Sequence, residues 1–247
     1  WTTPRLVQLT HCHNNKIMTR EIQLENDELY HIFNRVVDGA SMFNRDIDYE
    51  RFLVISYLAN DFSSGKIHLE RFGPNGVWST IGGEDYREKL VDIFSWCLMP
   101  THFHILLKQV KDGGTSLFLK RLQGSHSKYY NTVYKRHGVL FGGPFKAVHI
   151  GTDEQFTHVS RYIHLNPLKL FDPLWKERGY VEDKVGAEKF LKEYRWSSLA
   201  DYLGRDAPFM SLIDKRPIME YFENKGEEYW KFLLDWTKRG VVHEEDF

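Results

Sequence analysis

His102 and His104 stand two residues apart in the apolar stretch "SWCLMPTHFHILLK", which runs from Ser95 to Lys108. On a β-strand, alternate residues face the same side about 6–7 Å apart, so the two imidazoles would point together. Two imidazoles that converge from one face can hold a divalent metal at roughly 2.0–2.2 Å. The spacing also fits two half-buried histidines bonded to the backbone, so the pair alone leaves both readings open.

A second His-x-His pair, His11 and His13, flanks Cys12 in "LTHCHNN". This segment lacks the alternation of a strand, and polar residues surround it. No further Cys/His cluster follows at zinc-finger spacing. We therefore assign this pair to a tail rather than to a site.

A third metal ligand must come from another element. The segment 153–166 predicts a helix that carries His158, Tyr162 and Asn166 at four-residue steps, and therefore on one surface. Asn166 offers a carbonyl oxygen as a ligand, Tyr162 a nucleophilic oxygen beside the metal, and His158 a group to orient the tyrosine or take its proton. Alternatively, Tyr162 is a boundary aromatic and Asn166 only ends the helix. Because Pro167 disfavours helical backbone at the preceding residue, the direction of Asn166 stays open.

The stretch between Gly113 and Thr152 contains no Asp or Glu. Its cations and interleaved aromatic residues suit a phosphate backbone and stacked bases, although a solvated cationic helix face would have the same composition. Lys146, or Arg161 in the next helix, is a candidate phosphate clamp. The candidate nucleic-acid contacts are Lys120, Arg121, Lys128, Tyr130, Lys135, Arg136, Lys146 and Arg161.

The whole chain has a formal net charge of −1 over 247 residues, so its overall charge does not indicate a polyanionic partner. Two cysteines, Cys12 and Cys97, cannot form a disulfide framework, which favours a reducing, cytoplasmic setting. No run of eighteen apolar residues predicts a membrane span.

The elements that must position these residues alternate irregularly. We expect strands over 29–39, 66–72 and 102–110, a short hairpin or strand pair over 139–150, and helices over 46–64, 115–138 and 153–166, with Gly65 beyond the end of the first helix. Thr152 and Gln155 form a capping-box pair, and Pro167 is expected to end the last of these helices. The irregular alternation favours an α+β sandwich over a doubly wound parallel sheet.

A tyrosine hydroxyl, with a pKa near 10, is a poor nucleophile at neutral pH unless it has help. A divalent metal bound by His102, His104 and Asn166 would polarise a phosphodiester and stabilise the developing charge. Attack by Tyr162 would give a covalent tyrosyl phosphate. Because one ester replaces another, rejoining the strand would need no nucleotide cofactor.

These segments together resemble a known family. "WCLMPTHFHILLK" is similar to the His-hydrophobic-His strand of single-tyrosine transposases related to the insertion-sequence 200 group, and "RYIHLNPLKL" to the tyrosine segment of its REP-associated branch. "YHIFNRVVDG", "GPFKAVHI" and "YRWSSLADYL" match that branch in the same order. The resemblance runs from about Asp27 to Gly204. Thr101 and Val36 depart from residues common in the motifs, but neither removes a catalytic group.

The resemblance implies a ferredoxin-like α+β fold and an HUH-type enzyme that depends on Mg²⁺ or Mn²⁺. Such an enzyme nicks and rejoins single-stranded DNA bearing a hairpin through a 5′-phosphotyrosine, without a membrane, as a monomer or homodimer, and associates with the nucleoid when bound to DNA. Tyr162 becomes the nucleophile, His102 and His104 the paired ligands, and Asn166 the third. We expect a leader over 1–17, a catalytic domain over 18–205 and a helical extension over 206–247. A non-catalytic hairpin-binding protein and a zinc hydrolase are the alternatives, the latter without a HExxH helix.

Overall fold

The computed structural model describes residues 23–63, 85, 87–205 and 212–239. The leader with His11 and His13, and the strand expected over 66–72, lie outside the described residues. In chain order the elements are β1 (Leu29–Arg35), η1 (Val37–Gly39), α1 (Asp46–Ala59), β2 (Val91–Met99), β3 (His102–Gln109), α3 (Gly114–Val133), β4 (Lys146–Ile150), α4 (Asp153–Leu165), α5 (Leu168–Phe171), α6 (Trp175–Arg178), α7 (Lys184–Glu193), α8 (Leu199–Tyr202), α9 (Arg216–Met219), η4 (Glu220–Phe222) and α10 (Gly226–Arg239).

Four strands form one sheet in the order β2-β3-β1-β4, and every neighbouring pair is antiparallel. Along the chain, the first strands and helices follow the pattern β-α-β-β-α-β, with α1 and α3 as the two crossovers. This connectivity and strand order define the ferredoxin-like split βαβ arrangement. The prediction of an α+β, ferredoxin-like sandwich is therefore confirmed.

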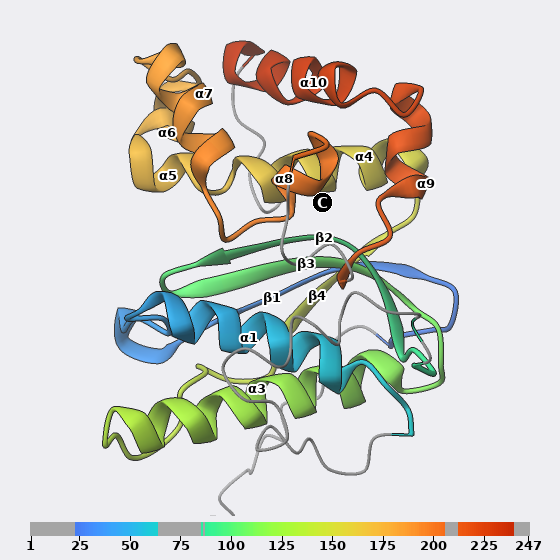
Figure 1. Ribbon diagram of the computed structural model, residues 1–247, viewed down its shortest axis with the longest axis vertical. Helices are drawn as coiled ribbons and strands as arrows, with labels where there is room; N and C mark the ends of the chain where they lie inside the picture. Colours follow the sequence, from blue (N-terminus) through green and yellow to red (C-terminus); the bar gives the residue numbers. More distant parts are fainter. Residues whose placement is uncertain (1–22, 64–84, 86, 206–211, 240–247) are drawn as a thin grey trace, which may run out of the picture.

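The sheet separates two layers of helices (Figure 1). Helices α1 and α3 pack side by side on one face, whereas α4 crosses the other face and lies against β2 and β3. Helices α7, α9 and α10 lie beyond the sheet on the α4 side (Figure 1). A side chain on the sheet therefore faces either the layer of α1 and α3 or the layer of α4.

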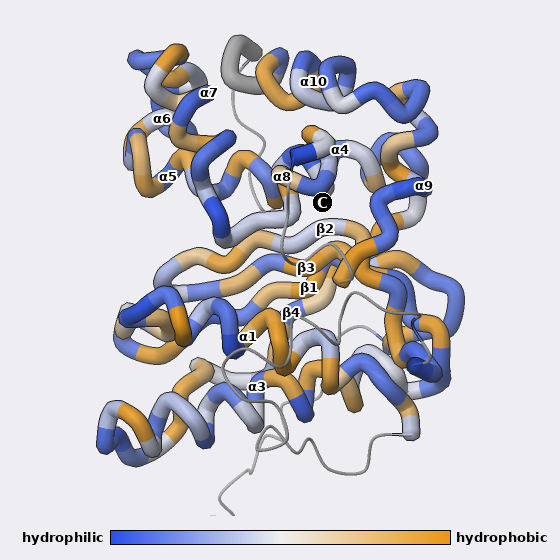
Figure 2. Tube along the Cα trace, viewed as in Figure 1, coloured by the Kyte–Doolittle hydropathy of each residue, from blue (hydrophilic) through white to orange (hydrophobic). Residues whose placement is uncertain are grey.

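Alternation along β1 divides its side chains between the two layers. Tyr30 and Ile32 join the core under α1 and α3, whereas His31 and Phe33 point to the α4 side, where their rings contact other site residues. The strands are among the most apolar parts of the trace in Figure 2, because both faces of this sheet are covered. Polar side chains on the α4 face, such as the buried His31 and His104, are thus exceptions that require partners.

Helix α4 begins as predicted, since the Thr152 side chain accepts a hydrogen bond from the Gln155 N–H across 3.1 Å. The Gln155 side chain reaches the Gly151 N–H instead of the Thr152 N–H. The expectation that Pro167 disfavours helical backbone before it is wrong. Asn166 has φ −52° and ψ −40°, and the chain continues through Pro167 (φ −57°, ψ −23°) into α5.

Other boundaries also differ from prediction. Helix α1 ends at Ala59 rather than near residue 65, because Asn60 leaves the helix and caps β2 with hydrogen bonds to Leu90 and Val91. The hairpin expected over 139–150 is wrong. Only β4 forms there, and it pairs with β1 rather than with a neighbouring segment, leaving a single bridge between Val36 and Phe141.

The described helices of the C-terminal extension pack on α4. Ile218, Tyr229 and Leu233 share a buried cluster with Val159 and Ile163 of α4. Helix α4 is therefore covered by the sheet on one side and by α10 on another (Figure 1). Within the described residues, no helix combines the length and the apolar character needed to cross a bilayer.

Candidate functional site

The two strand histidines and the helix tyrosine come together on the α4 face of the sheet. The rings of His102 and His104 have centroids 5.1 Å apart and stand edge to face, at 87°. The ring of Tyr162, on α4, lies 5.6 Å from that of His104, also edge to face. Tyr162 is only 1% exposed, so this contact is part of the packed interior. One chain thus supplies both the histidine pair and the tyrosine.

A third histidine, His31 on β1, completes the cluster. Its Nε2 lies 2.9 Å from Nδ1 of His104, with both rings buried and their planes only 22° apart. The His31 ring also meets the Tyr162 ring edge to face at 5.7 Å. Antiparallel pairing places Phe33 of β1 opposite His104, and His31 lies two residues further along the same strand face.

Each of the paired histidines uses its Nδ1 atom in a hydrogen bond. Nδ1 of His104 contacts His31, and Nδ1 of His102 lies 2.9 Å from the hydroxyl of Thr101. Nε2 of His104 is buried and has no hydrogen-bond partner among the described residues. Ring nitrogens that bind metals are commonly oriented in this way, with the opposite nitrogen held by a hydrogen bond.

Burial keeps all three imidazoles neutral at pH 7. Desolvation lowers the pKa of His31 to about 3. Desolvation also lowers the pKa of His102 to about 3, with additional repulsion from Arg35, Lys169 and Lys176. The pKa of His104 falls well below its ordinary value for the same main reason, with charge repulsion adding to it. Neutral imidazole carries the lone pair that a metal requires.

Asn166 lies directly beside the nucleophile candidate. Its side-chain nitrogen donates to the main-chain carbonyl of Tyr162 across 3.1 Å, and the residue is 3% exposed. The Asn166 N–H bonds to Ile163, three residues back, so the side-chain amide satisfies the Tyr162 carbonyl instead. Since the carbonyl can only accept, the amide nitrogen is turned toward it and Oδ1 forms the other arm of the amide.

Cations from several elements act on the cluster or lie near it. Nζ of Lys176, on α6, stands 4.5 Å from the centroid of the Tyr162 ring. Arg35 and Lys176 repel the protonated forms of both His102 and His104, and Lys169 adds to this effect at His102. Lys146 reaches within 5.8 Å of the Phe33 ring, which in turn lies 5.7 Å from His104. The field at the cluster therefore favours an anion such as a phosphodiester.

The structure places His158 and Arg161 differently from these residues. The His158 ring lies 5.8 Å from that of Phe232 on α10, and the Arg161 guanidinium lies 4.2 Å from the same ring. Arg161 is 6% exposed and also donates to the Phe232 carbonyl. Both side chains therefore face α10.

Helix α3 carries Lys120, Arg121 and Lys128, and ends at Val133, shortly before Lys135 and Arg136. It lies in the other layer, beyond the sheet from α4, the helix that carries Tyr162 (Figure 1). Lys120, Lys128 and Lys135 are exposed there. Arg121 donates to the Asp61 carbonyl across 2.6 Å and Arg136 to that of Val139 across 2.9 Å, so both guanidinium groups have structural partners.

Several aromatic side chains on α3 and just after it have partners inside the fold. Tyr130 is 6% exposed and its hydroxyl accepts from Asn44, while His126 is fully buried. The hydroxyls of Tyr129 and Tyr134 both donate to Asp48, a fully buried carboxylate on α1. The carboxylate of Asp48 thus holds the hydroxyl ends of Tyr129 and Tyr134 against α1.

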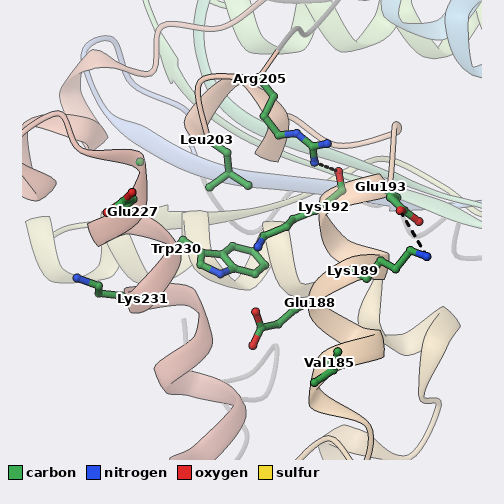
Figure 3. A pocket seen from close by; sticks show the side chains of 11 residues that line it. Val185, Glu188, Lys189, Lys192, Glu193, Leu203, Arg205, Glu227, Trp230 and Lys231 are labelled. Carbon is green, nitrogen blue, oxygen red and sulfur yellow. Dashed lines mark hydrogen bonds and ion pairs between the residues drawn. The ribbon is translucent and has the colours of Figure 1, made fainter.

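A groove between α7 and α10 is shown in Figure 3. Trp230 and Lys192 line it, with the Lys192 ammonium 4.6 Å from the Trp230 ring, and Arg205 donates to the Lys192 carbonyl. The groove shares no residue with the histidine cluster.

One observation indicates that the ring nitrogens of the cluster could bind a divalent cation. Nε2 of His104 is a buried polar atom without a partner among the described residues, which is costly unless something binds it. The described residues contain no group of three or more His, Cys, Asp or Glu that could hold a metal. A cation there would need His102, His104, the Asn166 oxygen and groups from substrate or water.

Sequence reasoning missed His31, Arg35 and Lys176. His31 and Arg35 occupy alternate positions of "YHIFNR" and face the cluster because β1 pairs with β3. That pairing would have identified them, but strand partners are not readable from one sequence. Lys176 carries no local signal, since it reaches the site only through the turn of the chain after α5.

Residues 79–166 match the model of a family described as IS200-like transposases. The matched stretch contains His102, His104, Tyr162 and Asn166. The match supports a transposase-type function in DNA processing. Among solved structures, a REP-associated tyrosine transposase bound to a REP hairpin is similar at a TM-score of 0.45 and 11% identity, over 76% of this chain and 87% of that chain. Comparison with curated proteins gives no match.

Proposed function

We propose that this chain nicks and rejoins single-stranded DNA at hairpin-bearing sites through a covalent 5′-phosphotyrosine on Tyr162, with His102, His104 and Asn166 holding Mg²⁺ or Mn²⁺. The observation that carries the proposal is the position of the Tyr162 ring, 5.6 Å from a histidine whose Nε2 is buried without a partner among the described residues. The similarity of residues 79–166 to IS200-like transposases supports the same reaction class.

The reaction transfers a phosphoryl group between two oxygens. The Tyr162 oxygen forms a bond to phosphorus, and the bond from phosphorus to the 3′-oxygen breaks. The phenol loses its proton, and the departing 3′-oxygen gains one to become a 3′-hydroxyl. The number of phosphoester bonds is unchanged, so the reverse step can reseal or transfer the strand. The bound cation supplies Lewis-acid polarisation of the phosphodiester.

The protein's own residues bind and orient the phosphate. The positive charges of Arg35 and Lys176 act on both His102 and His104, and Lys146 lies near Phe33 on the same face of the sheet. These charges attract the scissile phosphate to the histidines. Helix α4 fixes the nucleophile, because packing against the sheet and α10 leaves Tyr162 1% exposed. The tyrosine acts on a substrate bound at the histidines of its own chain, which makes a monomer sufficient for cleavage.

The test is a covalent adduct. Labelled hairpin-bearing single strands are incubated with the protein and Mn²⁺ and run on a denaturing gel. The wild type should form an adduct that is absent in Tyr162→Phe and strongly reduced in His102→Ala. Tyr180→Phe, which changes a tyrosine that is 49% exposed, is the matched control and should keep the adduct. An adduct that persists in Tyr162→Phe would place the nucleophile elsewhere.

The second candidate is a hairpin-binding protein without turnover. The burial of Tyr162 beside Lys176 favours it, because DNA can be bound by exposed cations near the site while the phenolic oxygen stays out of its reach. Binding of the labelled hairpin with no adduct, in Mn²⁺ and in Mg²⁺, would establish this alternative.

A further inference from the structure

His31 and His104 share one proton across a buried contact. Their Nε2 and Nδ1 atoms lie 2.9 Å apart, and the residues are 2% and 1% exposed. Because a neutral imidazole has one N–H donor and one lone pair, one ring must donate and the other must accept. The contact therefore couples the tautomers of the two rings.

Only two arrangements satisfy this contact. If His31 donates from Nε2, His104 accepts at Nδ1 and carries its own hydrogen on Nε2, which then has no acceptor among the described residues. If His104 donates from Nδ1, His31 accepts at Nε2, and Nε2 of His104 presents a lone pair. The first arrangement buries an unpaired donor, and the second exposes a ligand for a cation.

We propose that His31 is a positioning residue that accepts the Nδ1 hydrogen of His104 and thereby selects the tautomer of His104 that binds the divalent cation. This inference rests on the metal site of the proposed function. Partners of this kind typically change metal affinity by about 10–100-fold, because they fix both the tautomer and the orientation of the ring.

The local packing determines which substitutions test this role. His31 is enclosed by the rings of Phe33 and Tyr162, with centroids 5.2 Å and 5.7 Å away, so its shape also matters. His31→Phe keeps a planar ring but has no acceptor. His31→Gln places an amide oxygen near the position of Nε2 and can still accept the hydrogen of His104. The pair separates the loss of hydrogen bonding from the loss of packing.

The first measurement is Mn²⁺ binding to the full chain by titration calorimetry, without DNA. We expect His31→Phe to bind Mn²⁺ at least about 10-fold more weakly than the wild type, and His31→Gln to recover affinity to within about 3-fold. His149→Phe, which changes an exposed histidine on β4, should bind like the wild type. Equal affinity in His31→Phe and the wild type overturns the inference.

Two comparisons separate this inference from the proposed function. If His104→Ala binds Mn²⁺ as well as the wild type, or the wild type does not bind it, the metal site itself fails and the role of His31 fails with it. If His104→Ala loses binding while His31→Phe keeps it, only the role of His31 fails.

The second measurement does not depend on how the variants fold. In wild-type protein labelled with ¹⁵N-histidine and loaded with Mg²⁺, the ring nitrogens of His104 should show a protonated Nδ1 and an unprotonated Nε2. A hydrogen on Nε2 of His104 in the loaded protein overturns the inference.

Discussion

The side-chain nitrogen of Asn166 donates to the main-chain carbonyl of Tyr162, 3.1 Å away, and so takes over a hydrogen bond that the backbone leaves open before Pro167. The Asn166 N–H itself bonds to Ile163, three residues back, and proline has no N–H to offer. The Asn166 amide thus supplies the hydrogen bond that the end of α4 lacks, and this bond fixes the orientation of the amide next to Tyr162, the proposed nucleophile. Its oxygen, on the other arm, is the part that the proposed metal site requires.

Substitution of Asn166 separates these two uses of the amide. Asn166→Asp keeps an oxygen ligand but loses the donor, whereas Asn166→Ala loses both. If the oxygen binds the cation, Asn166→Ala should weaken Mn²⁺ binding about 10-fold or more. Asn166→Asp should bind Mn²⁺ clearly more tightly than Asn166→Ala. Titration calorimetry measures both affinities. Equal losses in the two variants would mean that the amide only caps the helix.

Lys176 offers a second test, because its ammonium stands 4.5 Å from the Tyr162 ring and repels protons at both strand histidines. A charged contact to the scissile phosphate contributes about 1.5–3 kcal/mol, which corresponds to roughly 10–100-fold in rate. Lys176→Gln should therefore slow adduct formation at saturating DNA by that factor. Lys189→Gln, on the exposed face of α7, is the matched control and should react at the wild-type rate. A wild-type rate in Lys176→Gln would contradict a contact between Lys176 and the scissile phosphate.

Much of the fold follows from local patterns. The alternation in "HFHILLKQV" and the Thr152 cap each predict an element that the structure contains, because these signals act within a few residues. The hairpin over 139–150 failed because β4 pairs with β1, more than a hundred residues earlier in the chain, and no local signal encodes that pairing.

In the candidate site, too, local patterns predict some residues, and only tertiary packing reveals the others. His102, His104, Tyr162 and Asn166 sit in two short segments, where spacing alone places them on one strand face and one helix surface. His31 and Lys176 arrive from other elements through tertiary packing. Tyr130, predicted as a nucleic-acid contact, is 6% exposed and bonds to Asn44, a placement that helical spacing alone does not predict, because surface and core residues can share it.

The two layers of the sandwich predict different effects for the cations that are proposed to contact DNA. Lys120 and Lys128 are exposed on α3, beyond the sheet from Tyr162, whereas Arg35 and Lys146 lie on the site face. Neutralising Lys120 and Lys128 with Gln should weaken hairpin binding and reduce its salt dependence, but leave the adduct rate at saturating DNA unchanged. Neutralising Arg35 and Lys146 should lower both. Filter binding at several salt concentrations and gel assays of the adduct measure the two quantities.

A contrary result would be equally informative. If the α3 pair lowers the adduct rate at saturating DNA as strongly as the site-face pair does, the substrate must wrap around the sheet to reach both layers. If neither pair changes affinity, these four cations do not contact the DNA backbone.

Tyr229 ties α10 to α4 through a buried network. Its hydroxyl lies 2.6 Å from Nδ1 of His164 and 3.1 Å from the Ser160 hydroxyl, and the opposite nitrogen of His164 meets Ser198, 2.8 Å away. Tyr229→Phe leaves the buried Nδ1 of His164 without this partner, whereas the Ser160 hydroxyl still bonds to the Thr157 carbonyl, so the free energy of unfolding should fall by about 1–3 kcal/mol. Urea unfolding measures this change. The exposed Tyr180→Phe should stay within about 0.5 kcal/mol of the wild type, and an equally small effect at Tyr229 would show that the network contributes little.

Asp201 gives the chain a pH-dependent stability. Burial raises the pKa of Asp201 from 3.8 to about 7, partly offset by the charge of Lys215, and one of its carboxylate oxygens is buried without a partner among the described residues. Below the unfolded pKa both states hold the proton, and the stability contribution is fully present. As pH rises toward 7 the unfolded chain ionises first, so stability falls, and above the folded pKa the loss is complete.

Asp201→Asn removes this titration while keeping a neutral side chain of nearly the same shape. The free energy of unfolding of the wild type, relative to that of the variant, should therefore decrease by up to about 4 kcal/mol between pH 4 and pH 7.5, since each pKa unit corresponds to about 1.4 kcal/mol. Urea unfolding at several pH values measures the difference. Parallel stability curves for the two proteins would show that the Asp201 carboxyl ionises as easily in the folded chain as in the unfolded one.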